Sequence, residues 1–210
     1  MTASPERRSP LDGWSDRFSA ASTARDCFAI REVPFLAQIA LRGDGADPNF
    51  RARAAEALGF ALPTANSWSG SIAGSALWLG PEEWLIVAEG EHSETLEQAL
   101  REKLRGHHHS LVDVSANRTA VEIAGTDARI VLAKGMPLDL HASSFPVSAL
   151  AQSLLAKAQV ILQSLDERPT FRIFVRPSFA GYLAEWLLDA AAECAASRGL
   201  DSGGLAARLG

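Results

Sequence analysis

A helix gives way to a proline-fixed loop in the stretch Val131-Leu-Ala-Lys-Gly-Met-Pro-Leu-Asp-Leu-His-Ala-Ser-Ser-Phe-Pro146. Gly135 suits the left-handed backbone conformation that commonly follows a helix, and Lys134 faces the negative end of the helix dipole. Pro137 cannot continue the helix, and Pro146 interrupts any regular element that could follow. The stretch therefore predicts a helix that ends near residue 135 and an irregular loop over residues 136–146.

This loop is more apolar than a loop surrounded by water should be. Leu138, Leu140 and Phe145 share it with polar residues such as Asp139. We expect it to pack against its own domain or against a partner chain, and the three apolar side chains are candidate interface residues. Trp78, shortly before a Gly-Pro turn, is a fourth candidate because tryptophan is enriched in interface anchors. The alternative that Trp78 is an ordinary core aromatic stays open.

A second informative stretch is Pro169-Thr-Phe-Arg-Ile-Phe-Val-Arg-Pro-Ser-Phe-Ala-Gly-Tyr-Leu-Ala-Glu-Trp-Leu-Leu188. The alternation over residues 171–175 predicts a strand, which Pro177 ends. Ser178 is then expected to cap a helix. By helical spacing, the apolar face of that helix consists of Phe179, Leu183, Trp186, Leu187 and Ala190.

Strands and helices alternate along the chain. The pattern predicts strands at residues 35–42, 75–79, 83–88, 110–114, 118–124, 153–155, 158–165 and 171–175. It predicts helices at residues 48–58, capped by Asp47, at 93–104, before Gly135, and from Ser178 onward. The possible halves 35–115 and 116–199 each read strand–helix–strand–strand–helix, and the first adds a closing strand. The fold class is therefore α+β, with two repeated units and mostly antiparallel sheet.

The two ends of the chain differ in composition from its middle. Residues 1–25 are rich in Ser, Ala, Arg and Asp and predict a flexible arm, which Trp14 and Phe18 could anchor to a neighbour. Residues 200–210 contain three glycines and predict a flexible tail. Residues 26–199 between them are expected to form the α+β domain.

Composition excludes several classes of function. The 210 residues are 47% apolar, which suffices for one core or for two small packed subdomains. A net charge of −5 argues against a nucleic-acid binder. The sequence contains no 18-residue apolar run and no hydrophobic signal core, and Cys27 and Cys194 have no metal-site spacing. We therefore expect a cytoplasmic protein that has no membrane segment and keeps its cysteines reduced.

The polar clusters do not combine into a recognisable site. The three histidines at residues 107–109 point in different directions and lack a partner motif, which favours a solvated loop. The segment 43–47, Gly-Asp-Gly-Ala-Asp, lacks the spacing of a phosphate-binding loop and is better interpreted as a strand-to-helix turn. For Asp113 a structural hydrogen bond or ion pair is the simpler interpretation. The sequence thus predicts no catalytic, cofactor-binding or metal-binding residue in this chain.

Four segments together resemble a known family. They are the two stretches quoted above, Leu79-Gly-Pro-Glu-Glu-Trp-Leu85 and Val112-Asp-Val-Ser-Ala-Asn-Arg-Thr-Ala120. In order and spacing the chain resembles the gamma subunit of bacterial heterotetrameric sarcosine oxidase, from about residue 35 to residue 193. The resemblance implies a fold similar to the N-terminal portion of the folate-binding aminomethyltransferases, which include the glycine-cleavage T-protein.

The resemblance also implies a role as a non-catalytic gamma subunit. The complex of that family oxidatively demethylates sarcosine to glycine, passes the one-carbon unit to tetrahydrofolate and releases hydrogen peroxide. The implied partners are the alpha, beta and delta subunits, mainly alpha. FAD, FMN and NAD are implied on alpha and beta, and the folate site on alpha. Two alternatives stay open: a free-standing folate-binding or aminomethyl-transfer protein of the same fold, and a small-molecule regulatory module of repeated α+β units.

Overall fold

The computed structural model describes residues 7–22, 27–90 and 93–204. Within them the strands are β1 (Ala29–Val33), β2 (Ala37–Gly43), β3 (Trp68–Gly70), β4 (Gly74–Gly80), β5 (Glu83–Ala88), β6 (His109–Asp113), β7 (Thr119–Ala124), β8 (Leu150–Leu155), β9 (Ala158–Asp166) and β10 (Thr170–Val175). The helices are α1 (Ser15–Ala21), α2 (Pro48–Leu58), α3 (Ser93–Lys103), the short 3-10 helix η1 (Ser115–Asn117), α4 (Ala128–Ala133) and α5 (Pro177–Gly204).

The strands form two five-stranded sheets in which all neighbouring strands are antiparallel. Sheet 1 has the order β3-β4-β5-β2-β6, and sheet 2 has the order β1-β7-β10-β9-β8. An isolated antiparallel bridge between Ser67 and Ala149 joins the two sheets. The α+β fold class predicted from the sequence is confirmed.

Both sheets are built by the same chain path. The path β2-α2-β3-β4-β5-α3, the first repeat, corresponds to β7-α4-β8-β9-β10-α5, the second repeat. Each repeat places three strands between its helices. The predicted strands account for all three in the second repeat but for only two in the first. The fifth strands differ in origin: β6 follows the first repeat, whereas β1 precedes it and joins sheet 2 beside β7. The sequence pattern predicted β6 but missed β1 and β3.

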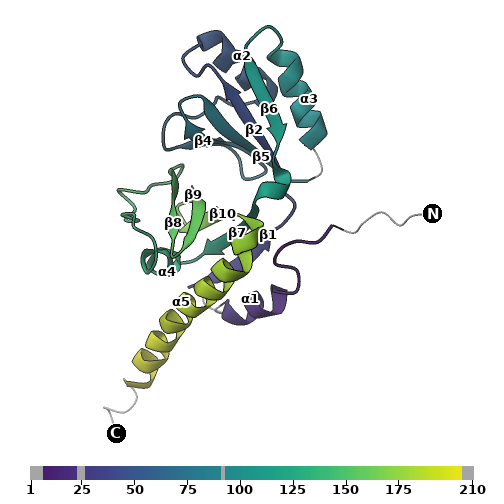
Figure 1. Cartoon of the computed structure of the whole chain (residues 1–210). Helices are drawn as coiled ribbons and strands as arrows, with labels where there is room; N and C mark the ends of the chain where they lie inside the picture. Colours follow the sequence, from purple (N-terminus) through teal and green to yellow (C-terminus); the bar gives the residue numbers. More distant parts are fainter. Residues whose placement is uncertain (1–6, 23–26, 91–92, 205–210) are drawn as a thin grey trace, which may run out of the picture.

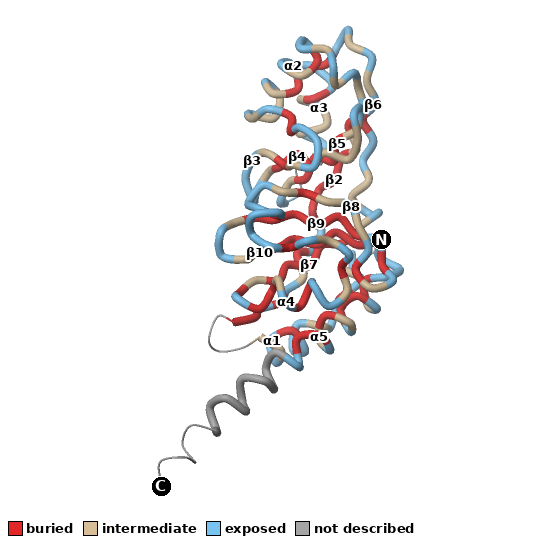
Figure 2. The backbone as a smooth tube through the Cα atoms, turned by 90° about the vertical axis from the view of Figure 1, so that its left-hand side faces the viewer, coloured by how far each residue is buried: buried red, intermediate tan, exposed pale blue. Residues whose placement is uncertain are grey.

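The molecule is layered as helices, sheet 1, sheet 2, helices (Figure 1). Helices α2 and α3 cover the outer face of sheet 1, and α1, α4 and α5 cover the outer face of sheet 2 (Figure 2). Buried apolar side chains fill all three spaces between the layers. Because both faces of each sheet are covered, central strands such as β10 are buried along nearly their whole length.

The helices that follow β2 and β7 end in different ways. Asp47 caps α2 by accepting a hydrogen bond from the Asn49 amide at 2.8 Å, and Gly59 ends the helix at φ +79°. The left-handed conformation expected at Gly135 is wrong, because Gly135 is absent from the residues with positive φ and α4 ends at Ala133. A Cβ at Gly135 would instead lie 2.5 Å from the Trp186 ring. Glycine is therefore required there by close packing against α5.

Helix α5 begins at Pro177, one residue before the expected cap, and its backbone is helical to Gly204. Its most deeply buried residues are Ala180, Leu183, Ala184 and Leu187. Phe179 is 40% exposed, so the predicted apolar face is wrong there, whereas Trp186 is partly buried and packs against the core as that prediction expects. They lie two turns apart, on the flank of the buried stripe. No helix in the described ranges has the length and apolar character to span a membrane.

Part of the predicted N-terminal arm is packed structure. Leu11 and the α1 residue Phe18 are buried in the core between sheet 2 and its helices, so residues 7–22 do not behave as a free arm. Trp14 packs against the same core of its own chain. The helical backbone of α5 also continues into the predicted tail. Residues 1–6, 23–25 and 205–210 of these two segments lie outside the described residues.

Candidate functional site

The loop 136–146 packs against its own domain. Leu140 and Phe145 are 5% and 7% exposed in the core of sheet 2, whereas Leu138 is only partly buried against that core. Arg129 of α4 fixes the loop by donating to the carbonyl oxygens of Leu140 and Phe145. Its guanidinium carbon also lies 5.0 Å from the centre of the Phe171 ring. Leu140 and Phe145 therefore face inward, and an interface through their side chains would require this loop to open.

The fourth interface candidate, Trp78, is partly buried. It packs against the core between sheet 1 and its helices and pairs across the hairpin with Trp84, which is 1% exposed. The next residue, Leu79, accepts a hydrogen bond at 2.8 Å from Gln152 of sheet 2. Trp78 therefore combines a core contact with a remaining accessible surface, close to a contact between the sheets.

The histidines take structural contacts. His107 lies 3.3 Å from the Asp47 carboxylate and edge-on to the Phe50 ring, and the His109 ring nitrogen is 2.8 Å from the His107 carbonyl. His141 is exposed, with its ring nitrogen 2.7 Å from the Ser143 hydroxyl. Among the described residues, no three His, Cys, Asp or Glu side chains gather as a metal site would require.

A buried charge cluster lies between the two sheets. Arg172 of β10 is fully buried and donates from Nε to Glu122 of β7 at 2.8 Å. Its other guanidinium nitrogens reach Glu89 at 3.2 Å and the Ile72 carbonyl at 3.3 Å, both in the first repeat. Arg31 of β1 pairs with the second oxygen of Glu122. Arg172 thus connects sheet 2 to sheet 1 through charge-assisted hydrogen bonds.

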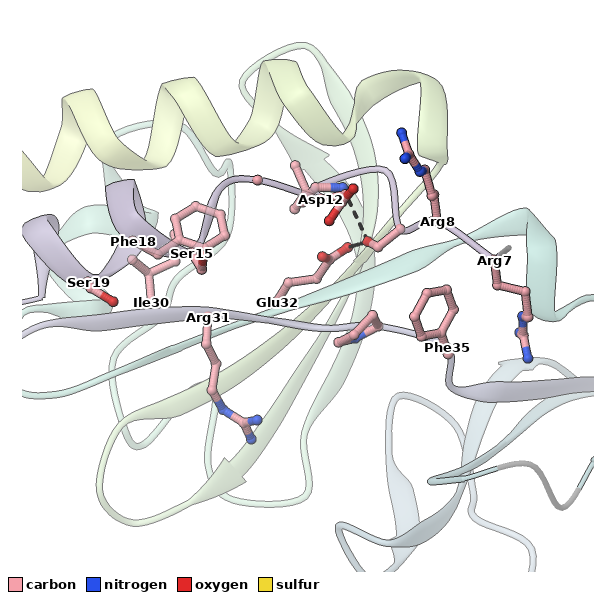
Figure 3. A pocket seen from close by; sticks show the side chains of 14 residues that line it. Arg7, Arg8, Asp12, Ser15, Phe18, Ser19, Ile30, Arg31, Glu32 and Phe35 are labelled. Carbon is pink, nitrogen blue, oxygen red and sulfur yellow. Dashed lines mark hydrogen bonds between the residues drawn. The ribbon is translucent and has the colours of Figure 1, made fainter. Parts of the chain in front are cut away.

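A hollow of about 500 Å³ lies between β1, α1 and the segment that precedes α1 (Figure 3). Glu32 extends from β1 toward that segment, where it accepts a hydrogen bond from Ser9. It also accepts a hydrogen bond of 2.7 Å from Thr119 of β7. Phe35 lies beside Arg7, whose guanidinium carbon is 4.9 Å from the ring centre. Because its carboxylate is already hydrogen-bonded by two hydroxyls, Glu32 serves here to anchor the segment.

A second hollow, also about 500 Å³, lies at one end of sheet 2 and is lined by Arg118 and Arg176. Arg118 directly precedes β7 and Arg176 directly follows β10, and the adjacent residues Thr119 and Val175 are paired across the sheet. Burial lowers the pKa of the Arg118 guanidinium, and the neighbouring charge of Arg176 lowers that pKa further. Glu83 opposes this shift, but no carboxylate in the described ranges hydrogen-bonds either guanidinium. We call these two residues the arginine pair.

Sequence reasoning missed both charged groups. Arg172 stands between Phe171 and Ile173 in a strand that is covered on both faces, and a buried arginine requires a carboxylate partner. That requirement was a usable signal, although the partner Glu122 is 50 residues away. The arginine pair had no local signal, because the pairing of β7 with β10 brings its members together.

The fold and these surfaces define a class: a twice-repeated α+β domain that presents polar and basic hollows suited to binding. A family model described as sarcosine oxidase, gamma subunit family matches residues 42–193. The chain is 36% identical over 196 residues to sarcosine oxidase subunit gamma of Corynebacterium sp. strain U-96, covering 91% of this chain and 93% of that protein. It is 34% identical over 194 residues to the Arthrobacter sp. subunit gamma, covering 90% and 92%.

Solved structures agree with this relationship. A chain of heterotetrameric sarcosine oxidase from Corynebacterium sp. U-96, in complex with pyrrole 2-carboxylate, superposes with a TM-score of 0.81 at 34% identity, covering 89% of this chain and 95% of that chain. Glycine cleavage system aminomethyltransferase T from Bartonella henselae shares the fold, with a TM-score of 0.58 at 16% identity over 81% of this chain and 48% of that chain. The chain belongs to the sarcosine oxidase gamma subunit family.

Proposed function

We propose that this chain is the non-catalytic gamma subunit of a sarcosine oxidase complex. The complex demethylates sarcosine oxidatively to glycine, with tetrahydrofolate as one-carbon acceptor and hydrogen peroxide as product. The similarity to subunit gamma of strain U-96, 36% identity over nearly the full length of both chains, carries this proposal. The match to a chain of a heterotetrameric enzyme supports a role inside an assembly.

The proposal includes the partners and cofactors. Alpha, beta and delta subunits complete the complex, and alpha provides most of the contact with this chain. FAD, FMN and NAD belong to alpha and beta, and tetrahydrofolate acts at alpha, so this chain contributes packing surface. We place the complex in the cytoplasm. The buried cluster around Arg172 supports a packing role for this chain, because its ion pairs with Glu122 and Glu89 connect the two sheets.

Leu138 and Trp78 are the proposed apolar contacts with alpha. Both are partly buried and keep some accessible surface, unlike Leu140 and Phe145. A partly exposed apolar side chain on a fixed frame can bind without reorganising its own domain, which lowers the entropic cost of association. Leu140 and Phe145 then contribute indirectly by holding the loop that presents Leu138.

Coexpression of this chain with alpha, beta and delta tests the proposal. We expect a stable complex with sarcosine-dependent peroxide production, and a colourless, inactive chain when it is expressed alone. Replacing Leu138 with Ser should weaken copurification of alpha while leaving the thermal midpoint of the free chain nearly unchanged. Phe145→Ser is the contrasting variant, because it should lower that midpoint by opening the core.

Two results would contradict the proposal. One is an isolated chain that carries flavin and oxidises sarcosine. The other is a chain that never copurifies with the other subunits. Binding of tetrahydrofolate by the isolated chain would support the free-standing folate-binding alternative instead.

A further inference from the structure

The arginine pair is exceptional in its surroundings. The chain as a whole has a net charge of −5, yet Arg118 and Arg176 lie side by side, and no carboxylate in the part of the chain that the structure describes is hydrogen-bonded to either. Arg118 is half-buried, so its charge loses hydration as well as being repelled by its neighbour. Both effects disfavour the charged form in the free chain. An anionic group bound between the two guanidiniums would relieve both.

Another hollow shares Arg118 with the hollow of the arginine pair. It has a volume of about 320 Å³ and is also lined by Arg7, Arg8 and Phe35. Four arginines therefore border two hollows that share Arg118. Such a concentration of one sign of charge attracts and orients a partner of the opposite sign.

The rim of these hollows is apolar. Leu154 of the edge strand β8 is 45% exposed beside the arginine pair, and Phe35 is 44% exposed at the other end. Pro137 also lines the hollow of the arginine pair and is exposed. Exposed apolar side chains next to arginines favour a protein partner, because exposed apolar patches mark interaction sites and arginine is enriched at protein interfaces.

We propose that the arginine pair binds a carboxylate side chain of an extended, acidic segment of another subunit. Each guanidinium offers donors in a planar fork, and two of them can enclose one carboxylate. Leu154 and Phe35 contact apolar side chains of the same segment on either side of the acid. This inference rests on the proposed function, because the segment belongs to a partner within the complex.

A protein segment fits these observations better than a nucleic acid. The overall charge of −5 repels a polyanion, and a nucleic acid would need basic contacts along a longer surface. The apolar rim also has no counterpart on a phosphate backbone. An acidic peptide segment satisfies the charge and the rim together.

The test uses the complex assembled by coexpression of all four subunits. The charge-reversal variant is Arg118→Glu combined with Arg176→Glu. Its control is Arg105→Glu combined with Arg168→Glu, which changes the net charge equally at two exposed arginines outside both hollows. We expect the reversal to reduce copurified partner subunits by about tenfold or more, and the control to leave them unchanged. The effect should decrease as salt is raised, since salt screens partly exposed charges.

The milder variant Arg118→Gln with Arg176→Gln guards against misfolding. It removes the repulsion between the arginines, so the thermal midpoint of the free chain should stay the same or rise, while assembly still weakens. A fall in that midpoint would show that the pair stabilises this chain and would overturn the inference. Normal assembly of both the reversal and the glutamine variants would overturn it as well, while leaving the proposed function standing. A wild-type chain that fails to assemble defeats the proposed function itself.

Photo-crosslinking identifies the occupant. A benzophenone side chain in place of Leu154 should capture one peptide of a partner subunit, and mass spectrometry should find Asp or Glu within it. Capture should be lost in the charge-reversal background. A captured peptide without an acidic residue, or capture that is unaffected by the reversal, contradicts the proposal.

Discussion

The two repeats share one chain path but differ on the faces that their sheets turn toward each other. Sheet 1 contributes apolar side chains there, including Leu77, Leu85 and Val87. Sheet 2 contributes Phe174 and Ile161 but also the buried ion pair of Arg172 and Glu122. Two sheets of the same topology can therefore differ in the side chains on their inner faces. Sheet 2 can bury Arg172 because the first repeat supplies two further hydrogen-bond acceptors, the Ile72 carbonyl and Glu89.

The helix layers differ as well. The first repeat is covered by two helices of 11 residues each, whereas the second has a six-residue helix, a long α5 and the additional helix α1. The short α4 leaves space that the proline-fixed loop fills with Leu140 and Phe145. The second repeat thus depends on contacts between residues distant in sequence, and it also carries the arginine pair.

The largest expected effect comes from breaking the buried ion pair. Replacing Glu122 with Ala leaves Arg172 buried, with Glu89 as its one carboxylate partner among the described residues, and should lower the free energy of unfolding by about 3–5 kcal/mol. Urea denaturation of the full chain measures this change. Replacing Glu89, which is 45% exposed, should cost no more than about 1 kcal/mol.

An apolar replacement of both members provides the control. Glu122→Leu with Arg172→Met should restore much of the stability, because no unpaired charge stays buried. If Glu122→Ala costs less than about 1 kcal/mol, the claim that the ion pair distinguishes the inner face of sheet 2 from that of sheet 1 is wrong. That claim is also wrong if the double variant Glu122→Leu with Arg172→Met is no more stable than Glu122→Ala alone.

The next largest effect is expected at Gly135. A methyl group there would lie 2.5 Å from Trp186, so Gly135→Ala should cost roughly 1–3 kcal/mol. Gly74→Ala is the matched control, since no atom lies within 4 Å of its added Cβ, and it should stay within about 0.5 kcal/mol of the wild type. Adding Trp186→Phe removes the two ring atoms nearest the methyl and should recover part of the loss. No recovery would show that the strain lies elsewhere.

Gly59 occupies the corresponding place after α2 but for a different reason. Its φ is +79° and its added Cβ would meet no atom within 4 Å, so Gly59→Ala should cost about 1 kcal/mol through backbone strain alone. Asparagine tolerates this conformation better than alanine. Gly59→Asn should therefore be milder than Gly59→Ala, whereas Gly135→Asn should be worse than Gly135→Ala. Thermal denaturation of the four variants checks the reversal, and the same order at both sites would contradict it.

These two glycines show how far the sequence could predict the structure. Local signals predicted α2 with its cap, the hairpin of β4 and β5, and the repeat itself. A glycine after a helix looks the same in both repeats, however, and only packing against residue 186 separates them. The ion pair, the burial of Leu11 and Phe18, and the arginine pair likewise depend on contacts between segments distant in sequence. Such contacts leave no periodic trace, so the candidate site was less predictable than the fold.

The smallest expected effect concerns α1, which has no counterpart in the first repeat. Arg17 of α1 donates two hydrogen bonds of 2.7 Å to Glu185 of α5, and the interaction with Arg17 lowers the pKa of the Glu185 carboxyl. A lowered pKa in the folded state means that the ion pair stabilises the fold above the ordinary glutamate pKa of about 4.3, and that this contribution is lost as the pH falls through the lower, folded value. Because both side chains are exposed, the contribution is small.

Hydrogen exchange of the α1 amides should detect that contribution. Glu185→Gln should exchange faster than the wild type at pH 7, and the two should become equal as the pH falls well below 4.3, about the ordinary glutamate value. Asp189→Asn, also exposed on α5 and without an ion pair among the described residues, is the matched control and should leave α1 unchanged at both pH values. If Glu185→Gln leaves α1 exchange unchanged at pH 7, Leu11 and Phe18 hold the helix without help from charge. Helix α1 would then be held to the second repeat by apolar contacts alone. The two repeats would still differ in charge on their inner faces, where only sheet 2 carries the Arg172–Glu122 ion pair among the described residues.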